Sequence, residues 1–214
     1  MEKLFLTALL MGMSVSGIHA QNAAIEPTFT EWHDLQVNAV NRFATHTDFF
    51  AFVPYENLRG TKFDMKKSAN YLSLDGDWKF NWVENADQRP TDFFRTDFDD
   101  SQWKTFPVPG IWEVNGYGDP VYVNIGFAWR GNFKNNPPEV PIKENHVGSY
   151  RRTIRIPDNW DGKQVIAHFG SVTSCVYLWV NGKFVGYSED SKIGPEFDVT
   201  KYLKKGENQF AFQV

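Results

Sequence analysis

Two adjacent carboxylates, Glu189 and Asp190, are the side chains of this sequence best suited to chemistry. They follow a run of apolar and aromatic residues and stand between Ser188 and Ser191. A carboxylate pair can hydrolyse a glycosidic bond when the two groups face each other about 5 Å apart, or roughly 6.5–9.5 Å apart in inverting enzymes. Neighbouring residues of an extended chain point to opposite faces, so at most one of these two can reach a given site. The alternative is a solvated loop tip, because most charged side chains are exposed.

A second polar group, Asn124, lies among aromatic residues. The rings nearest in sequence are those of Tyr122, Phe127 and Trp129. An amide can exchange hydrogen bonds with sugar hydroxyls while flat rings cover the apolar face of the sugar. The alternative is that Asn124 bonds the backbone of its own loop, which is a common role for asparagine.

A β-hairpin directly before Glu189 is the most distinct element that must position these groups. Runs of β-branched and aromatic residues at 176–180 and 183–187 flank Asn181 and Gly182. Two such runs joined by Asn-Gly predict a type I′ turn, in which both central residues have positive φ. Because the second run leads straight into the two carboxylates, they are expected at the rim of a sheet.

The rest of the pattern is that of an antiparallel β-protein. Alternating or continuous apolar runs predict strands near residues 78–82, 150–156, 165–169 and 210–214, and turn residues separate them. No long amphipathic helix is predicted. We therefore predict an all-β fold, an antiparallel β-sandwich of jelly-roll type over residues 71–214.

The N-terminal part of the chain divides into two segments. Residues 1–20 have the features of a secretory signal peptide, since the apolar run at 4–15 is too short for a typical membrane span. This predicts a periplasmic or secreted protein. Residues 21–70 show little periodicity but many aromatic residues, which predicts an extended arm that drapes over a larger body.

Composition disfavours several functional classes. A net charge of −4 without a basic cluster argues against nucleic-acid binding. The single cysteine, Cys175, can form no internal disulfide and is expected as a buried, inert thiol. No cysteine and histidine residues have zinc-binding spacing, and no glycine-rich loop suits a phosphate. Aromatic residues make up 16% of the chain, which suits a thick β core and also contact with sugar rings.

Several short motifs occur in a characteristic order. They are Asp75-Gly76-Asp77-Trp78-Lys79-Phe80, Phe98-Asp99-Asp100-Ser101-Gln102-Trp103, Val108-Pro109-Gly110-Ile111-Trp112, Gly116-Tyr117-Gly118-Asp119-Pro120-Val121-Tyr122-Val123-Asn124, Asn136-Pro137-Pro138-Glu139-Val140-Pro141, Val185-Gly186-Tyr187-Ser188-Glu189-Asp190-Ser191 and Glu196-Phe197-Asp198. Together they resemble the N-terminal part of glycoside hydrolase family 2, specifically its large bacterial β-galactosidases. Glu31-Trp32 with the segment 37–42 resembles the entry segment of that branch. The resemblance runs from about residue 31 to residue 214.

This resemblance implies a jelly-roll sugar-binding domain packed beside a central barrel of the same chain. The catalytic glutamates, and any magnesium, are expected in that barrel beyond residue 214, so the fragment alone should be inactive. Asn124 and Asp190 match family residues that contact the galactosyl unit, and Asp190 also matches a ligand of a monovalent cation such as sodium. Glu189 is then turned away. The loop 125–134 is slightly longer than the family pattern, which leaves its sugar contacts open.

The implied parent protein is a retaining, homo-oligomeric hydrolase of terminal β-D-galactosides. The apolar alternation at 210–214 runs to the last residue, so we expect the sequence to be an N-terminal piece of this longer protein. Two alternatives stay open. One is a stand-alone carbohydrate-binding module, and the other is a purely structural domain of a family 2 β-glucuronidase or β-mannosidase.

Overall fold

The computed structural model of the chain describes residues 26–53, 57, 59–62, 64–120 and 139–214. All strands in this part pair antiparallel, and its helices are single 3₁₀ turns, so the predicted antiparallel β-sandwich is confirmed. The strands are β1 (Ala39–Val40), β2 (Gly76–Val83), β3 (Lys104–Val108), β4 (Val147–Arg155), β5 (Ile166–His168), β6 (Cys175–Val180), β7 (Lys183–Glu189), β8 (Glu196–Asp198) and β9 (Glu207–Gln213). The 3₁₀ turns are η1 (Glu31–His33), η2 (Met65–Lys67), η3 (Ala86–Gln88), η4 (Glu113–Asn115), η5 (Asp158–Trp160) and η6 (Thr200–Tyr202).

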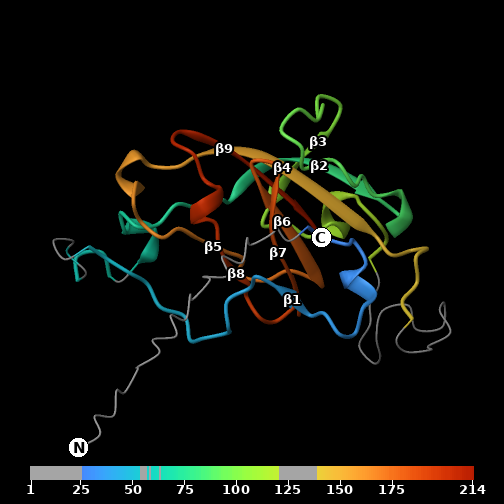
Figure 1. Cartoon of the computed structure of the whole chain (residues 1–214), viewed down its shortest axis with the longest axis horizontal. Coiled ribbons are helices and arrows are strands. Elements are labelled where there is room, and N and C mark those ends of the chain that lie inside the picture. Colours follow the sequence, from blue (N-terminus) through green and yellow to red (C-terminus); the bar gives the residue numbers. More distant parts are fainter. Residues whose placement is uncertain (1–25, 54–56, 58, 63, 121–138) are drawn as a thin grey trace, which may run out of the picture.

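The described strands form a large sheet and a small one (Figure 1). The large sheet has the order β1-β7-β6-β9-β4-β2-β3, and the small sheet pairs β5 with β8. Between the two sheets lies the main core, which contains Phe80, Tyr150, Leu178 and Phe212 from the large sheet and Phe197 from the small one. The small sheet therefore closes one face of the large sheet.

The hairpin of β6 and β7 forms as the Asn-Gly pair predicts. Asn181 has φ 52° and Gly182 has φ 79°, which is the left-handed conformation that a type I′ turn requires. A register shift between Leu178 and Trp179 marks a bulge in the same hairpin. The sequence did not predict this bulge, because it depends on pairing with distant strands.

The second face of the large sheet is also covered, so β6 and β7 are almost fully buried. The ring of Phe29 in the arm stacks on Trp179 with centroids 5.9 Å apart. Phe94, in the loop after η3, stacks on the same indole at 5.0 Å. In Figure 1 the blue start of the described chain leads to β1, which pairs with β7. The arm thus supplies part of the protein's core.

Glu31 fastens the arm to this second face. Its carboxylate is 6% exposed and accepts hydrogen bonds from the Tyr177 hydroxyl at 2.9 Å and from the backbone N–H of Thr28 at 2.7 Å. Burial opposes ionisation, but these hydrogen bonds outweigh it and hold the pKa of Glu31 below its usual value. A charged carboxylate can therefore be buried here.

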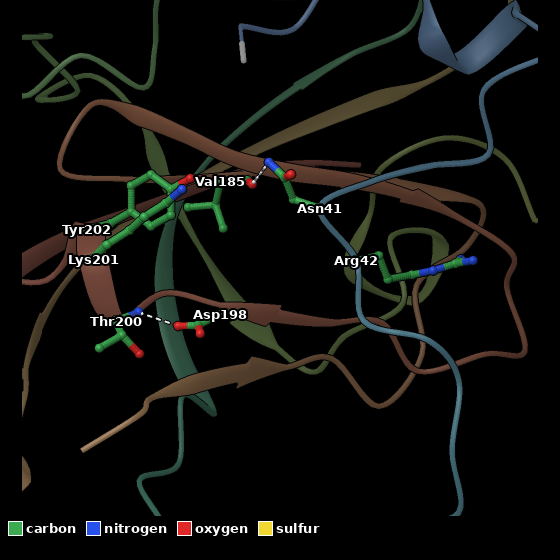
Figure 2. A pocket seen from close by; sticks show the side chains of 7 residues that line it. All are labelled: Asn41, Arg42, Val185, Asp198, Thr200, Lys201 and Tyr202. Carbon is green, nitrogen blue, oxygen red and sulfur yellow. Dashed lines mark hydrogen bonds between the residues drawn. The ribbon is translucent and has the colours of Figure 1, made fainter. Parts of the chain in front are cut away.

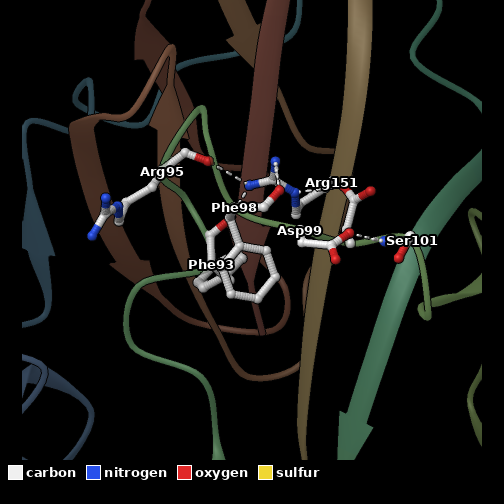
Figure 3. Close-up of polar contacts among 7 residues, drawn as sticks. Phe93, Arg95, Phe98, Asp99, Ser101 and Arg151 are labelled. Carbon is white, nitrogen blue, oxygen red and sulfur yellow. Dashed lines mark hydrogen bonds and ion pairs between the residues drawn. The ribbon is translucent and has the colours of Figure 1, made fainter.

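Arg151, on β4, holds the loop after η3 against the sheet (Figure 3). Its side chain is 3% exposed and forms an ion pair with Asp100 at 2.7 Å. The guanidinium also donates to the backbone carbonyls of Phe93 and Arg95, the latter at 2.9 Å. Because one buried group satisfies several loop acceptors, the loop has a fixed position over the second face.

Candidate functional site

Asp190 is the first residue after β7, at the rim of the large sheet. It is exposed and has φ 93°, a conformation that is uncommon for a residue with a Cβ but tolerated by aspartate and asparagine. Its Oδ1 accepts a hydrogen bond from the backbone N–H of Lys192 at 2.8 Å, which closes a tight turn. Within the described part of the chain, Oδ2 has no hydrogen-bond partner. One carboxylate oxygen is therefore available to a ligand.

Glu189 is held elsewhere. Its Oε1 accepts a hydrogen bond of 2.6 Å from the hydroxyl of Tyr187, and the side chain is half-buried. Burial, together with the nearby carboxylate, raises the pKa of Tyr187, so the phenol stays protonated and donates. The two adjacent carboxylates thus have separate partners, and they do not form a facing pair.

The arm fixes the peptide that precedes Asp190. The backbone N–H of Glu189 donates to the carbonyl of Asn38 at 3.0 Å. On the other side, Nη1 of Arg42 donates to the carbonyl of Glu189 at 3.2 Å and to the hydroxyl of Ser188 at 2.9 Å. Sequence reasoning placed Arg42 in a family motif but gave it no role, because its partners lie more than 140 positions away.

The loop that carries Asp190 is also fixed at its far end. The hydroxyl of Ser171 donates to the carbonyl of Ser191 at 2.8 Å, and the N–H of Phe169 donates to the carbonyl of Pro195 at 3.0 Å. A Cβ at Gly194 would lie 2.7 Å from the carbonyl oxygen of Phe169, so only glycine fits. The loop therefore lies tightly against the segment after β5.

A polar cleft of about 310 Å³ lies beside this loop, between the arm and the end of β5. The carboxylate of Glu196 is hydrogen-bonded to two imidazoles, to Nε2 of His46 in the arm at 2.8 Å and to Nδ1 of His168 on the paired strand β5 at 3.0 Å. The backbone carbonyl of Thr47 and the carboxylate of Glu196 raise the pKa of His46. Asp48 and Lys192 line the same cleft. The contact of His46 ties the arm to the small sheet, and no local sequence pattern predicts it.

A second hollow of about 440 Å³ lies between the arm and η6 (Figure 2). Its side chains mainly bond backbone: Asn41 donates to the carbonyl of Val185 at 2.9 Å, and Asp198 accepts from the N–H of Thr200 at 2.9 Å. In Figure 2 the side chain of Arg42 points away from the other labelled residues. Among these described lining residues, no nucleophile is paired with a base.

Asn124 and the loop 125–134 lie outside the described residues. Among the residues that are described, no group of three or more histidine, cysteine, aspartate or glutamate side chains could hold a metal ion. Burial raises the pKa of the Cys175 thiol to about 12, so this thiol is no nucleophile. A search of the described helices found none long and apolar enough to cross a membrane.

Comparison with known proteins identifies the family of this chain. Residues 71–214 match the family described as glycosyl hydrolases family 2, sugar binding domain. The chain is 39% identical over 188 residues to a β-galactosidase of Priestia megaterium, and 40% identical over 181 residues to one of Halalkalibacterium halodurans. These alignments cover 87% and 85% of this chain but only 18% of each relative.

A solved structure shares the fold. The crystal structure of a β-glycosidase from Bacteroides vulgatus superposes with a TM-score of 0.50 at 25% identity, over 67% of this chain and 17% of that one. The family match spans most of the sequence, including β2–β9 and the Asp190 loop. This chain therefore belongs to glycosyl hydrolases family 2, and its residues 71–214 are the family's sugar binding domain.

Proposed function

We propose that this chain is the N-terminal sugar-binding domain of an exported β-galactosidase, and that Asp190 and Asn124 form part of its galactosyl pocket. The observation that carries the proposal is the free carboxylate oxygen of Asp190 at the end of β7. Relatives that align over 87% and 85% of this chain are named β-galactosidases, which supports the choice of sugar.

In this proposal the chain binds and orients the substrate. The free oxygen of Asp190 accepts hydrogen bonds from galactosyl hydroxyls, and a charged acceptor makes such bonds stronger than neutral ones. Asn124 can both donate and accept. The tight turn at Asp190 means that little side-chain freedom is lost when the sugar binds.

The carboxylate of Asp190 also fits the expected sodium ion in part. A hard cation prefers oxygen ligands, and Oδ2 is such a ligand without a protein partner in the described part of the chain. Since no cluster of acidic or histidine ligands surrounds it there, Asp190 would supply one ligand and other groups the rest. The bound cation would attract the oxygen of a sugar hydroxyl.

The bond-breaking step belongs to other parts of the protein. The adjacent carboxylates here do not form an acid and nucleophile pair, because Glu189 is directed to Tyr187, Asp190 is directed to Lys192, and the two groups do not face each other. The two glutamates of a retaining mechanism are proposed in the barrel of the full-length polypeptide. The 214-residue chain alone should then release no product from any β-galactoside.

A substrate panel tests this function on the full-length polypeptide. Chromogenic β-galactoside, β-glucuronide and β-mannoside are compared at equal concentration, and the anomer first released from the galactoside is read by proton NMR. We expect hydrolysis of the galactoside with release of β-galactose. Preferential cleavage of another glycoside refutes the substrate, and release of the α-anomer refutes retention.

Export is tested separately by N-terminal sequencing of the mature protein. Cleavage after the apolar segment should give a first residue at or near Gln21. An intact Met1 in the mature protein would contradict the proposed periplasmic or secreted location.

A further inference from the structure

The geometry points to Arg42 as a positioning residue for Asp190. We propose that this arm residue sets the affinity of the galactosyl site by fixing the peptide bond between Glu189 and Asp190. The inference deepens the proposed function and depends on Asp190 contacting the sugar. It concerns a residue in the arm, outside the matched segment 71–214.

Arg42 acts directly on the peptide group that precedes Asp190. Its Nη1 donates to the carbonyl of Glu189 at 3.2 Å, and this carbonyl belongs to the same planar peptide group as the nitrogen of Asp190. The hydroxyl of Ser188 donates to the same carbonyl at 3.0 Å and accepts from Arg42 at 2.9 Å. Two donors therefore fix the orientation of this one peptide plane.

Few other torsional freedoms remain at Asp190 once this peptide is fixed. The N–H of Glu189 is held by the carbonyl of Asn38, so the arm binds the end of β7 on both of its backbone groups. Beyond the fixed peptide, Asp190 has only its own φ of 93° and its side-chain torsions, and its bond to Lys192 restrains these. The direction of Oδ2 thus follows from the peptide plane that Arg42 holds.

The charged guanidinium of Arg42 is directed at the end of β7 and not at a carboxylate. In the described part of the chain, no carboxylate lies within ion-pair distance of Arg42, although the residue is only partly exposed. A guanidinium that merely fastened the arm could do so through any acceptor on β7. Instead it donates to the last hydroxyl and the last carbonyl before Asp190.

A matched control is available in the neighbouring residue. Asn41 also links the arm to β7, through a 2.9 Å hydrogen bond to the carbonyl of Val185, but it does not touch the peptide before Asp190. Asn41 has φ 56°, so Asn41→Gly removes the side chain without backbone strain. This variant loosens the arm and leaves the Asp190 peptide alone.

The test is a double-mutant cycle in the full-length polypeptide, assayed with a chromogenic β-galactoside. The assay temperature is kept well below the melting temperature of the least stable variant, so that every variant is folded. Arg42→Met should lower kcat/KM about tenfold in the wild-type background, because a charge-assisted hydrogen bond is lost. In the Asp190→Asn background, Arg42→Met should lower kcat/KM by less than about twofold, since Arg42 and Asp190 act as one unit. Arg42→Lys should restore part of the activity, and Asn41→Gly should leave kcat/KM unchanged.

The outcomes distinguish the sugar contact of Asp190 from the positioning role of Arg42. If Asp190→Asn matches wild type, the proposed sugar contact is wrong, and the inference falls with it. If Asp190→Asn is impaired but the Arg42→Met effect is absent, or is equally large in both backgrounds, the contact stands and the positioning role is refuted. If Arg42→Met does not fold, Ser188→Ala takes its place in the cycle, because it removes the other donor to the same carbonyl.

Discussion

Replacing Arg151 by methionine should be among the most destabilising single changes in this chain. The guanidinium is 3% exposed, pairs with Asp100 at 2.7 Å and donates to two loop carbonyls (Figure 3). Methionine fills a similar volume but leaves these acceptors without a donor. Breaking a buried ion pair from one side costs about 3–5 kcal/mol.

The partial exposure of Asp100 should keep the loss of stability in Arg151→Met at the lower end of this range. Its side chain is 27% exposed, so water can partly replace the lost guanidinium. We therefore expect a loss of about 3 kcal/mol in the free energy of unfolding, or about 6–12 °C in melting temperature for a chain of this size. Urea unfolding followed by tryptophan fluorescence gives the first quantity, and calorimetry gives the second.

The control is Arg95→Gln, which removes an ion pair with Asp97 in which both side chains are more than half exposed. It should leave the urea midpoint unchanged, because exposed pairs contribute little. A loss below about 1 kcal/mol in Arg151→Met would show that the loop does not depend on this guanidinium.

Three further predictions concern titratable groups. The pKa of Glu31 is lowered in the folded chain, so its ionised carboxylate stabilises the fold above the unfolded pKa of 4.5, and this stabilisation is lost as pH falls through the folded pKa. Limited proteolysis of the arm should therefore accelerate in that acidic range in wild type but not in Glu31→Gln. The pKa of His46 is raised, so the stabilisation by its charged imidazole is fully present below pH 6.5 and is lost as pH rises through the folded pKa. Glu196→Gln should lower this pKa in an NMR titration, and an unchanged pKa would contradict the ion pair of His46 with Glu196. Cys175, with a pKa of about 12, should resist iodoacetamide at pH 8 until urea is added, and rapid labelling of the folded chain would show that the thiol is accessible.

The parts of the fold that the sequence predicts well are those with local causes. The turn at Asn181 and Gly182 depends on the φ angles of these two residues, so it could be recognised from the pair alone. β3 lies at the edge of the large sheet, where Pro107 is tolerated although it cannot donate to a neighbouring strand. Asp190 was placed at a sheet rim because its strand ends there.

The parts that the sequence does not predict depend on distant partners. The burial of Glu31 could not be foreseen, since its partner Tyr177 lies 146 positions away. The same holds for Arg42 and for the contact of Glu196 with His46, because both join the arm to the C-terminal strands. The arm lacks a periodic pattern because it packs through single side chains rather than through one continuous face.

The central claim, that Asp190 contacts the sugar, is tested most directly by Asp190→Asn in the full-length polypeptide. Asparagine tolerates φ 93° and can still accept the hydrogen bond from Lys192, so the fold and the melting temperature should not change. What is lost is Oδ2 as a charged acceptor, because the amide NH₂ of asparagine takes its place; a hydrogen bond to a charged group contributes about 1.5–3 kcal/mol and thus roughly 10- to 150-fold in kcat/KM. We expect a loss of this size for a β-galactoside, together with a weaker response to sodium. Activity and sodium response equal to wild type would contradict the claim and leave the domain a scaffold.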